Sequence, residues 1–457
     1  MLSTKVKTSL KAIVGPDGFI DDTEDLLAYS YDSFVEEMVP DVALLPRSTA
    51  EVAAILAIAN RERIPVTARG AGTSISGGPV AIQKGIVLSL TRMNRIIEVN
   101  TRDRYCIVQP GVVNGELQAR LAHEGFFYPP DPGSYMVSTI GGNVANNAGG
   151  PRCLKYGVTV DYVLSMEVVL ATGEVIRFGS RNVKDVAGYR LQALFCGSEG
   201  TLGIITEITL KVVPLPAAQR TILAIYNDLE ATSATVSDII GSGILPAALE
   251  LMDKTVINAV EDDAHIGLPR HAEGVLLIEV DGEDEAVEKQ MGTIVAKARA
   301  HGAQEVIEAR SQAERDKLWH ARRSAYGVFA RLAPECIVED ATVPVSRVPE
   351  MIRGIRAIAD RYRLRMGILA HAGDGNMHPL IATDSRDKEE WKRVEAANRE
   401  IIELALRFNG TLSGEHGIGL AKKDYLPMMI DAPTRAFMAN IKRCVDPNGI
   451  LNPGKFV

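Results

Sequence analysis

The 457-residue sequence is poor in cysteine, and none of its five cysteines belongs to a C-x-x-C pair. A zinc ribbon or an internal iron–sulfur cluster needs such clustered thiolates, so the sequence excludes both. The five cysteines are scattered along the chain: Cys106, Cys153, Cys196, Cys336 and Cys444. We expect them to be reduced and mostly buried.

Long apolar runs and an excess of positive charge are also lacking. No stretch approaches the roughly 18 uninterrupted apolar residues of a membrane span, and the start, "MLSTKVKTSLKAIVGPDGF", has no apolar core of an export signal. The formal net charge of −8 argues against nucleic acid as the main ligand. We therefore expect a soluble, cytoplasmic protein without a transmembrane segment, peripheral to a membrane only through a partner.

The composition, 46% hydrophobic and 24% charged, is that of a globular protein, and the length indicates two to four structural units. Short β-like runs separated by glycine turns fill residues 42–215, with amphipathic helices such as 48–60 between them. "PLPAAQR" at 214–220 predicts a boundary, after which strands alternate with charged helices. The pattern predicts an α+β protein with at least two domains.

The segment "RGAGTSISGG" at residues 69–78 has the glycine content of a phosphate-binding loop. Ile75 stands where the Rossmann fingerprint G-x-G-x-x-G needs its third glycine. Gly78 and Pro79 stand where a P-loop needs lysine and Ser/Thr. The segment therefore matches neither the Rossmann fingerprint nor the P-loop. It is a run of backbone N–H donors with two small hydroxyls, Thr73 and Ser74, which can hold an anion in a third kind of fold.

Three further glycine-rich segments follow: "PPDPGS" at 129–134, "STIGGNVANNAGG" at 138–150 and "GSEGTLGIITE" at 197–207. A large ligand would need several such loops, because glycine permits close approach of the backbone to a ligand. The asparagine amides of the second segment suit the edge of a heteroaromatic ring as well as phosphates. Tight turns in a β-rich domain remain the alternative.

The second half of the chain concentrates histidines in two glycine-flanked loops. "HAGDGNMH" contains His371 and His378, and "SGEHGIG" adds Glu415 and His416. Two imidazoles and a carboxylate are a common ligand set for a catalytic divalent metal. The spacing differs from H-E-x-x-H, so histidines satisfied within their loops remain the alternative.

The stretch "KLWHARRSAYG" places Arg322 and Arg323 on a predicted helix. Successive helical side chains diverge by about 100 degrees, so only one of the two is expected to point inward. An inward guanidinium could grip a carboxylate through two hydrogen bonds. A solvated, charged helix face is the alternative.

Taken in order, these segments, together with "NPGK" near the end, resemble the flavin-linked D-2-hydroxyacid dehydrogenases, which include D-lactate dehydrogenase and the flavoprotein subunit of glycolate oxidase. The resemblance implies FAD bound in a fold of the vanillyl-alcohol-oxidase type. Members that attach FAD covalently commonly place a histidine in the first loop, where this chain has Thr73 and Ser74, so we expect dissociable FAD. By similarity, the residues lining the cofactor are Arg69, Gly70, Ala71, Gly72, Thr73, Ser74, Gly77, Gly78, Pro130, Asp131, Ser134, Thr139, Gly142, Asn143, Gly150, Gly157, Ile205 and Asn452.

The resemblance also implies the domains. Residues 1–215 would form the FAD-binding domain, with its core at about 38–217. Residues 216–410 would form an α/β substrate cap with a mainly antiparallel sheet, and residues 411–457 would return to the FAD-binding domain.

The same resemblance assigns roles to the second-half residues. Those matching His371, His378 and Glu415 bind a divalent metal, which could be zinc, manganese or iron. The residue matching His416 is the catalytic base, and the arginine of W-x-x-R, here Arg322, binds the substrate carboxylate.

One position bears on the substrate. The hydroxyglutarate branch usually carries an asparagine two residues after the second metal histidine, whereas this chain has Leu380. A small D-2-hydroxy acid, lactate or glycolate, is therefore expected. D-2-hydroxyglutarate or another larger 2-hydroxy acid is the second hypothesis, and a non-catalytic FAD-binding subunit for electron relay is the third.

The electrons need an external acceptor, because the chain has no cysteine cluster for an internal relay. We expect an electron-transferring flavoprotein, an iron–sulfur subunit or a quinone-linked chain as partner. A homodimer is also considered.

Overall fold

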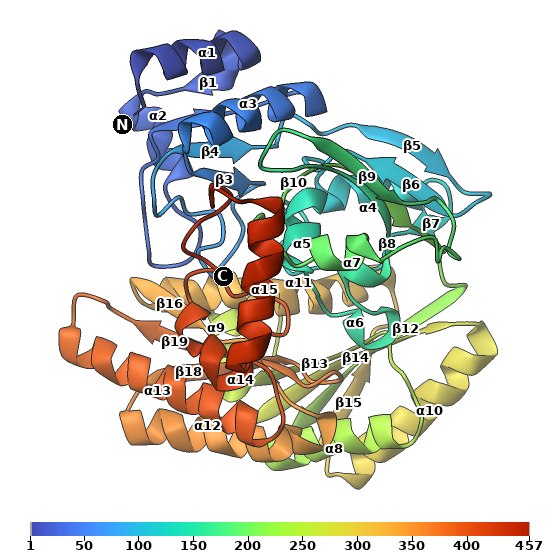
Figure 1. Ribbon diagram of the computed structural model, residues 1–457. Helices are drawn as coiled ribbons and strands as arrows, with labels where there is room; N and C mark the ends of the chain where they lie inside the picture. The colour runs from blue at the N-terminus through green and yellow to red at the C-terminus, as the bar shows by residue number, and fades with distance from the viewer. Residues whose placement is uncertain (1, 457) are drawn as a thin grey trace. The chain divides into compact units, whose positions relative to one another are not determined.

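The computed structural model describes residues 2–456, and Figure 1 shows its helices and strands. The chain forms two compact units. Unit 1 contains the residues up to Gly149, Val158–Leu215 and the residues from Glu415 onward. Unit 2 contains Gly150–Gly157 and Pro216–Gly414. The short segment 150–157 therefore groups with unit 2, although the sequence analysis placed it in the first domain.

Unit 1 begins with a small four-stranded sheet in the order β1-β2-β4-β3. Its strands are β1 (Phe19–Ile20), β2 (Val42–Leu44), β3 (Val66–Arg69) and β4 (Ile86–Ser89). The last three are parallel, as crossover connections such as α3 (Thr49–Glu62) require. Apolar residues of α1 (Thr4–Val14) and α3 pack with this sheet in one buried cluster.

A second sheet in unit 1 is antiparallel, with the order β5-β6-β10-β8-β9. Its strands are β5 (Ile96–Asn100), β6 (Tyr105–Val108), β8 (Val163–Val169), β9 (Val175–Gly179) and β10 (Ile204–Lys211). A two-stranded pair joins β7 (Phe126–Phe127) to β11 (Val213–Pro214). The other helices of unit 1 are α2 (Thr23–Leu26), α4 (Asn114–Ala122), α5 (Ile140–Asn146), α7 (Leu191–Phe195), α14 (Leu426–Met429) and α15 (Ala432–Val445).

Unit 2 is built on an eight-stranded sheet in which all pairs are antiparallel, with the order β15-β12-β14-β13-β18-β19-β16 and β17 also paired to β19. The sheets and helices of the two units confirm the predicted α+β class and the mainly antiparallel sheet after residue 216. The strands are β12 (Ala218–Tyr226), β13 (Ala248–Asp253), β14 (Gly274–Gly282), β15 (Glu305–Glu308), β16 (Glu335–Val338), β17 (Ala341–Thr342), β18 (Arg365–His371) and β19 (Asn376–Thr383).

Helices cover both faces of this sheet (Figure 1). One face carries α8 (Leu229–Gly241), α10 (Asp284–Ala300), α12 (Val348–Tyr362) and α13 (Lys388–Arg407). The other face carries α9 (Lys254–Ala264) and α11 (Gln312–Phe329). Because strand side chains alternate between faces, Ile222 joins the first buried cluster and its neighbour Leu223 joins the second. The remaining helix of unit 2 is α6 (Cys153–Tyr156).

The five cysteines are free thiols. Cys106 and Cys196 are buried, Cys153 and Cys336 are half-buried and Cys444 is exposed, so fewer are fully buried than expected. Burial raises the pKa of the Cys106, Cys196 and Cys336 thiols to about 12. Among residues 2–456, none of the helices has the length and apolar character needed to cross a bilayer.

Candidate active site

His371 and His378, which were predicted to lie within a loop, lie instead on the paired strands of one hairpin of unit 2, because the glycine-rich loop between them is only a short turn. His371 ends β18 and His378 lies in β19, and the register pairs His371 with Asn376 and Leu369 with His378. The two histidines therefore point to the same face of the sheet, with ring centroids 5.1 Å apart and ring planes at 85°. Both are buried. The turn between them needs glycine at Gly375, where φ is +83° and a Cβ would lie 2.0 Å from a backbone oxygen.

A buried carboxylate connects His371 to the predicted substrate arginine. Glu250 lies in β13, directly across from His371 in the sheet register. Its two oxygens lie 2.9 and 2.8 Å from His371 Nδ1, and Oε2 lies 2.5 Å from Nη2 of Arg322. The Glu250 side chain is fully buried and that of Arg322 is 7% exposed. As expected for adjacent helical residues, only one arginine points inward: Arg323 is half-buried, with its guanidinium over the Trp319 ring.

Helix α11, which carries Arg322, is held to the sheet one turn earlier by a second buried acid. Trp319 donates from Nε1 to Glu279 Oε2 at 2.7 Å, and Thr221 donates to the same carboxylate at 2.8 Å. Glu279 lies in β14, the neighbour of β13. Trp319 and Arg322 are three residues apart and lie on one helix face, so two acids on adjacent strands fix the position of the helix.

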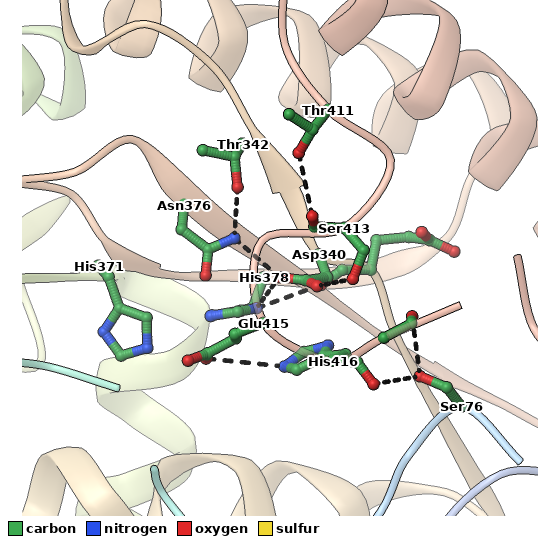
Figure 2. Close-up of polar contacts among 12 residues, drawn as sticks. Ser76, Asp340, Thr342, His371, Asn376, His378, Thr411, Ser413, Glu415 and His416 are labelled. Atoms are coloured by element: carbon green, nitrogen blue, oxygen red, sulfur yellow. Dashed lines mark hydrogen bonds and ion pairs between the residues drawn. The ribbon is translucent and has the colours of Figure 1, made fainter. Parts of the chain in front are cut away.

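Asp340 organises the chain that leads to Glu415. Its carboxylate accepts hydrogen bonds from Asn376 Nδ2 at 2.7 Å and from Ser413 Oγ at 2.5 Å, as Figure 2 shows. Asn376 also donates to Thr342 Oγ1 at 2.9 Å. The backbone N–H of Gly414 donates to the Asp340 carbonyl at 3.2 Å. The last residues of unit 2 are therefore tied to its sheet directly before Glu415.

In unit 1, the segment after Gly414 is held mainly through its backbone. The carbonyl of His416 accepts a hydrogen bond from Ser76 Oγ at 2.9 Å, which Figure 2 shows. It also accepts one from Asn146 Nδ2 at 2.9 Å. The Glu199 carboxylate accepts from the N–H groups of Ile418 at 2.7 Å and Gly419 at 2.8 Å. Burial raises the Glu199 pKa. These bonds fix the backbone while the His416 side chain stays partly accessible, at 15% exposure, with Nε2 3.8 Å from Glu415 Oε1.

The loop 69–78 of unit 1 has the features of an anion site. Within residues 2–456, the backbone N–H groups of residues 71–75 donate no hydrogen bond. Arg69, at the end of β3, is buried, and its Nη1 has no protein partner. A Cβ on Gly72, whose φ is +74°, would lie 2.2 Å from that guanidinium. A run of N–H donors beside a buried cation fits the diphosphate of FAD.

Two other glycine-rich segments of unit 1 are connected to this loop, one directly and one through α5. Thr139 caps α5 by accepting from the Gly142 N–H at 3.3 Å, and a Cβ on Gly70 would lie 2.3 Å from its Oγ1. Asn114 donates from Nδ2 to the carbonyl of Pro130 and to Asn143 Oδ1, both at 3.1 Å, so it joins the 129–134 segment to α5.

Residues near the end of the chain brace the same loop. Asn452 donates from Nδ2 to the Gly78 carbonyl at 3.1 Å, and the Lys455 ammonium donates to the carbonyls of Gly78 at 3.0 Å and Val80 at 2.5 Å. Of the other predicted cofactor residues, Ile205 lies in β10, whereas Gly150 and Gly157 belong to unit 2.

Comparison with known proteins places this geometry in a family. Residues 40–179 match the family described as "FAD binding domain", and residues 215–456 match "FAD linked oxidases, C-terminal domain". The chain belongs to the FAD-linked oxidases. This oxidase is 46% identical over 456 residues to "Glycolate oxidase subunit GlcD" of Bacillus subtilis (strain 168), covering 100% of this chain and 97% of the relative. It is 38% identical to a "D-lactate dehydrogenase" of Anaerostipes hadrus, covering 91% and 89%.

Solved structures support the fold. The oxidase superposes on p-cresol methylhydroxylase with a TM-score of 0.83 at 18% identity, covering 99% of this chain and 96% of the other. An alkyldihydroxyacetonephosphate synthase gives a TM-score of 0.78 at 20% identity, covering 100% and 86%. The fold is thus of the vanillyl-alcohol-oxidase type, and the protein is an FAD-dependent oxidoreductase of the glycolate oxidase and D-lactate dehydrogenase type.

The sequence analysis missed several residues of this region. Glu250, Asp340 and Glu199 were not predicted, although each contacts a predicted site residue or holds the chain beside one. A sequence signal exists for Glu250, which is a single acid inside the apolar run "AALELM". A charge in a strand buried on both faces needs partners, so such a position marks a polar site within a core.

Proposed function

We propose that this FAD-linked oxidase oxidises a small D-2-hydroxy acid, D-lactate or glycolate, to the 2-oxo acid in a reaction that depends on FAD and a divalent metal. The observation that carries the proposal is the buried pair of His371 and His378 on one sheet face, beside the arginine Arg322. Imidazoles suit zinc and iron, and a carboxylate, which also suits manganese, completes a three-ligand set.

Glu415 is the proposed third ligand. It follows Gly414 directly, and Gly414 and Ser413 are bonded to Asp340 in the same unit as the two histidines. Consecutive Cα atoms are about 3.8 Å apart, so this anchor limits how far the Glu415 backbone can move from the hairpin. Bound FAD supplies the hydride acceptor at flavin N5, and a divalent ion supplies the Lewis acidity that lowers the pKa of the substrate hydroxyl.

The substrate carboxylate is assigned to Arg322. Glu250 holds its Nη2, while its buried Nε has no hydrogen-bond partner in the protein, so the guanidinium retains a donor for a second carboxylate. A charged donor left without a partner inside a protein is costly, and a bound anion would remove that cost. Arg322 thus orients the acid by its carboxylate and determines which face of Cα is presented.

His416 is the proposed base that accepts the proton of the substrate hydroxyl. Its backbone carbonyl is fixed by Ser76 and Asn146, and the imidazole takes no part in those two bonds. A neutral imidazole at this position takes the hydroxyl proton as the hydride leaves Cα.

The small size of the substrate is supported by Leu380. It is fully buried in the apolar cluster that α9 and α11 form on the sheet. An apolar side chain at this position offers no hydrogen bond to a second carboxylate, so a dicarboxylic acid would lose the contact that a polar residue could give it.

An external electron acceptor is part of the proposal. The relatives include a glycolate oxidase "subunit" and an Arabidopsis thaliana "D-lactate dehydrogenase [cytochrome]", names that support a partner protein as acceptor. Rapid production of hydrogen peroxide from D-lactate and oxygen alone would count against it.

The test is anaerobic stopped-flow reduction of the flavin by D-lactate, L-lactate, glycolate, malate and D-2-hydroxyglutarate, with and without a chelator. We expect D-lactate or glycolate to bleach the flavin fastest, and chelation to slow this reaction while FAD stays bound. Metal analysis of the His371→Ala and His378→Ala variants provides the direct check, with His301→Ala, a surface histidine of unit 2, as control. Unchanged reduction after complete metal removal would refute the metal dependence.

A further inference from the structure

Glu250 stands between two groups that the proposed function uses. Its carboxylate accepts from Arg322 Nη2 at 2.5 Å and faces His371 Nδ1 at 2.8 Å, and its side chain has no exposure to solvent. A buried carboxylate costs several kcal/mol unless it is paired and hydrogen-bonded. The adjacent guanidinium supplies the charge partner, and because a guanidinium can only donate, it uses a Glu250 oxygen as acceptor.

This acceptor determines the tautomer of His371. A carboxylate has no proton to give, so the ring nitrogen that faces it, Nδ1, must carry one. The neutral ring then has its lone pair on Nε2. Arg322 Nη2 lies 3.4 Å from the same Nδ1 and could donate only to a nitrogen without a proton. The Glu250 oxygens are closer, at 2.9 and 2.8 Å, so the distances favour a proton on Nδ1 that is donated to Glu250.

His378 also faces a hydrogen-bond acceptor through its Nδ1, but this acceptor is weaker. Its Nδ1 lies 3.3 Å from the carbonyl of Glu339 and 3.7 Å from Asp340 Oδ1. A backbone carbonyl is a neutral acceptor, whereas Glu250 is a charged one, and charge-assisted hydrogen bonds are about twice as strong as neutral ones. His371 is therefore the histidine whose orientation depends most on a single side chain.

We propose that Glu250 is a positioning residue that fixes the Nδ1–H tautomer of His371 and the direction of the Arg322 guanidinium through the same carboxylate. This inference rests on the proposed function, in which His371 binds the metal and Arg322 the substrate. One acid then couples the two subsites: its loss weakens metal binding through His371 and acid binding through Arg322 together. Outer-shell partners of metal-bound histidines typically contribute about 10- to 100-fold in metal affinity.

Glu279 provides a matched control for burial and charge. It is 2% exposed against 1% for Glu250, lies on the adjacent strand β14 and accepts from Trp319 and Thr221. Among the described residues, its carboxylate accepts from Gln219, Thr221 and Trp319, and neither His371 nor Arg322 is a partner. Glu279→Gln therefore perturbs a similar buried carboxylate, which is bonded to the same helix α11, without directly touching His371 or Arg322.

The experiment compares wild type, Glu250→Gln, Glu250→Asp and Glu279→Gln. The affinity for zinc is measured by calorimetry on protein that contains FAD but no metal. KM and kcat for D-lactate are measured by flavin reduction. For Glu250→Gln we expect about a 10- to 100-fold loss of zinc affinity and a rise in KM, with Glu250→Asp recovering part of both. Glu279→Gln is expected to lower the melting temperature but to keep zinc affinity near wild type, because Glu279 does not contact His371.

Equal losses of zinc affinity in Glu250→Gln and Glu279→Gln, or no loss in either, would overturn the proposal. Nitrogen-15 histidine spectra of the zinc-loaded wild type, assigned with His371→Asn, test it without a Glu250 variant: we expect the proton of His371 on Nδ1, and a proton on Nε2 refutes the proposal. A wild type that binds no zinc and reduces its flavin with D-lactate regardless refutes instead the metal assignment on which the inference rests.

Discussion

The Ser413 hydroxyl donates a 2.5 Å hydrogen bond to the Asp340 carboxylate, two residues before Glu415. This bond, together with the Gly414 N–H bond to the Asp340 carbonyl, limits the freedom of the chain that presents Glu415. We predict that Ser413→Ala lowers divalent-metal affinity by roughly tenfold, in the lower range for an outer-shell bond. Isothermal titration with zinc measures the change.

Ser385→Ala is the control for that prediction, because Ser385 donates a similar 2.6 Å bond to Glu335 in the same unit. It should cost stability of about 1 kcal/mol and leave zinc affinity unchanged. Equal zinc affinities for the two variants would show that Ser413 does not position Glu415.

The conformation of Gly72 predicts how the FAD loop responds to a side chain. Gly72→Ala places a methyl group at φ +74° and 2.2 Å from the Arg69 guanidinium, so Arg69 must move. We expect about 1–2 kcal/mol of backbone strain and, in addition, a loss of FAD affinity of tenfold or more, since a charge-assisted bond is worth about 1.5–3 kcal/mol. FAD titration of the apoprotein, followed by fluorescence, gives the affinity.

The Gly125→Ala variant separates the backbone strain from the loss of FAD affinity. Gly125 has a φ of +76°, but a Cβ there meets nothing within 4 Å. It should therefore show the strain without the loss of FAD affinity. If both variants bound FAD like wild type, the assignment of the 69–78 loop to the diphosphate would be wrong.

Replacement of His416 by alanine tests the proposed base. Its backbone is held by Ser76 and Asn146 through the carbonyl, which alanine keeps, so the fold and FAD content should be preserved. Anaerobic flavin reduction by D-lactate should slow by about 10²- to 10⁴-fold, the usual contribution of general base catalysis. A variant that reduces its flavin at the wild-type rate would remove His416 from the mechanism and favour a relay subunit.

The buried ammonium of Lys455 predicts a pH dependence of stability. Burial lowers its pKa from the usual 10.5 to about 8, although Glu199 and Asp32 act in the opposite direction. Between pH 8 and 10.5 the unfolded chain binds this proton and the folded protein does not, so the contribution of Lys455 to the free energy of unfolding rises with pH, by at most about 1.4 kcal/mol per unit.

Urea unfolding of wild type and Lys455→Met at pH 8, 9 and 10 measures this contribution as a difference, in which the alkaline titration of other groups cancels. Wild type should gain stability relative to the variant across the series. Lys254→Met, which removes a 2.7 Å ion pair with Glu273 in unit 2, is the control and should show a constant offset. A constant offset for Lys455→Met as well would contradict the lowered pKa.

The sequence was sufficient for those parts of the fold that short motifs encode. The failed Rossmann and P-loop patterns left an anion loop of another kind at 69–78, and the family resemblance, confirmed by the comparisons, supplied the fold. The inward orientation of one arginine of the Arg322–Arg323 pair followed from helix geometry alone. These features depend on residues close together in the chain.

Features that depend on distant pairing could not be predicted. Glu250 meets His371 because β13 pairs with β18, 121 residues further along, and no local pattern specifies that register. Its isolated charge in an apolar strand signalled a polar partner without saying which one. The grouping of 150–157 with unit 2 likewise depends on Lys155 and Tyr156, whose side chains bond to Asp281.

The pairing of Val66 with Leu451 and the bond from Asn452 to Gly78 have a consequence for biosynthesis. The loop on which FAD is proposed to lie is synthesised early, but its brace follows 374 residues later. On the ribosome, this edge of the first sheet stays open until Leu451 and Asn452 have been synthesised. A stalled or truncated product would therefore lack the bond from Asn452 to Gly78. Binding of FAD would then indicate that the chain has been synthesised as far as Asn452.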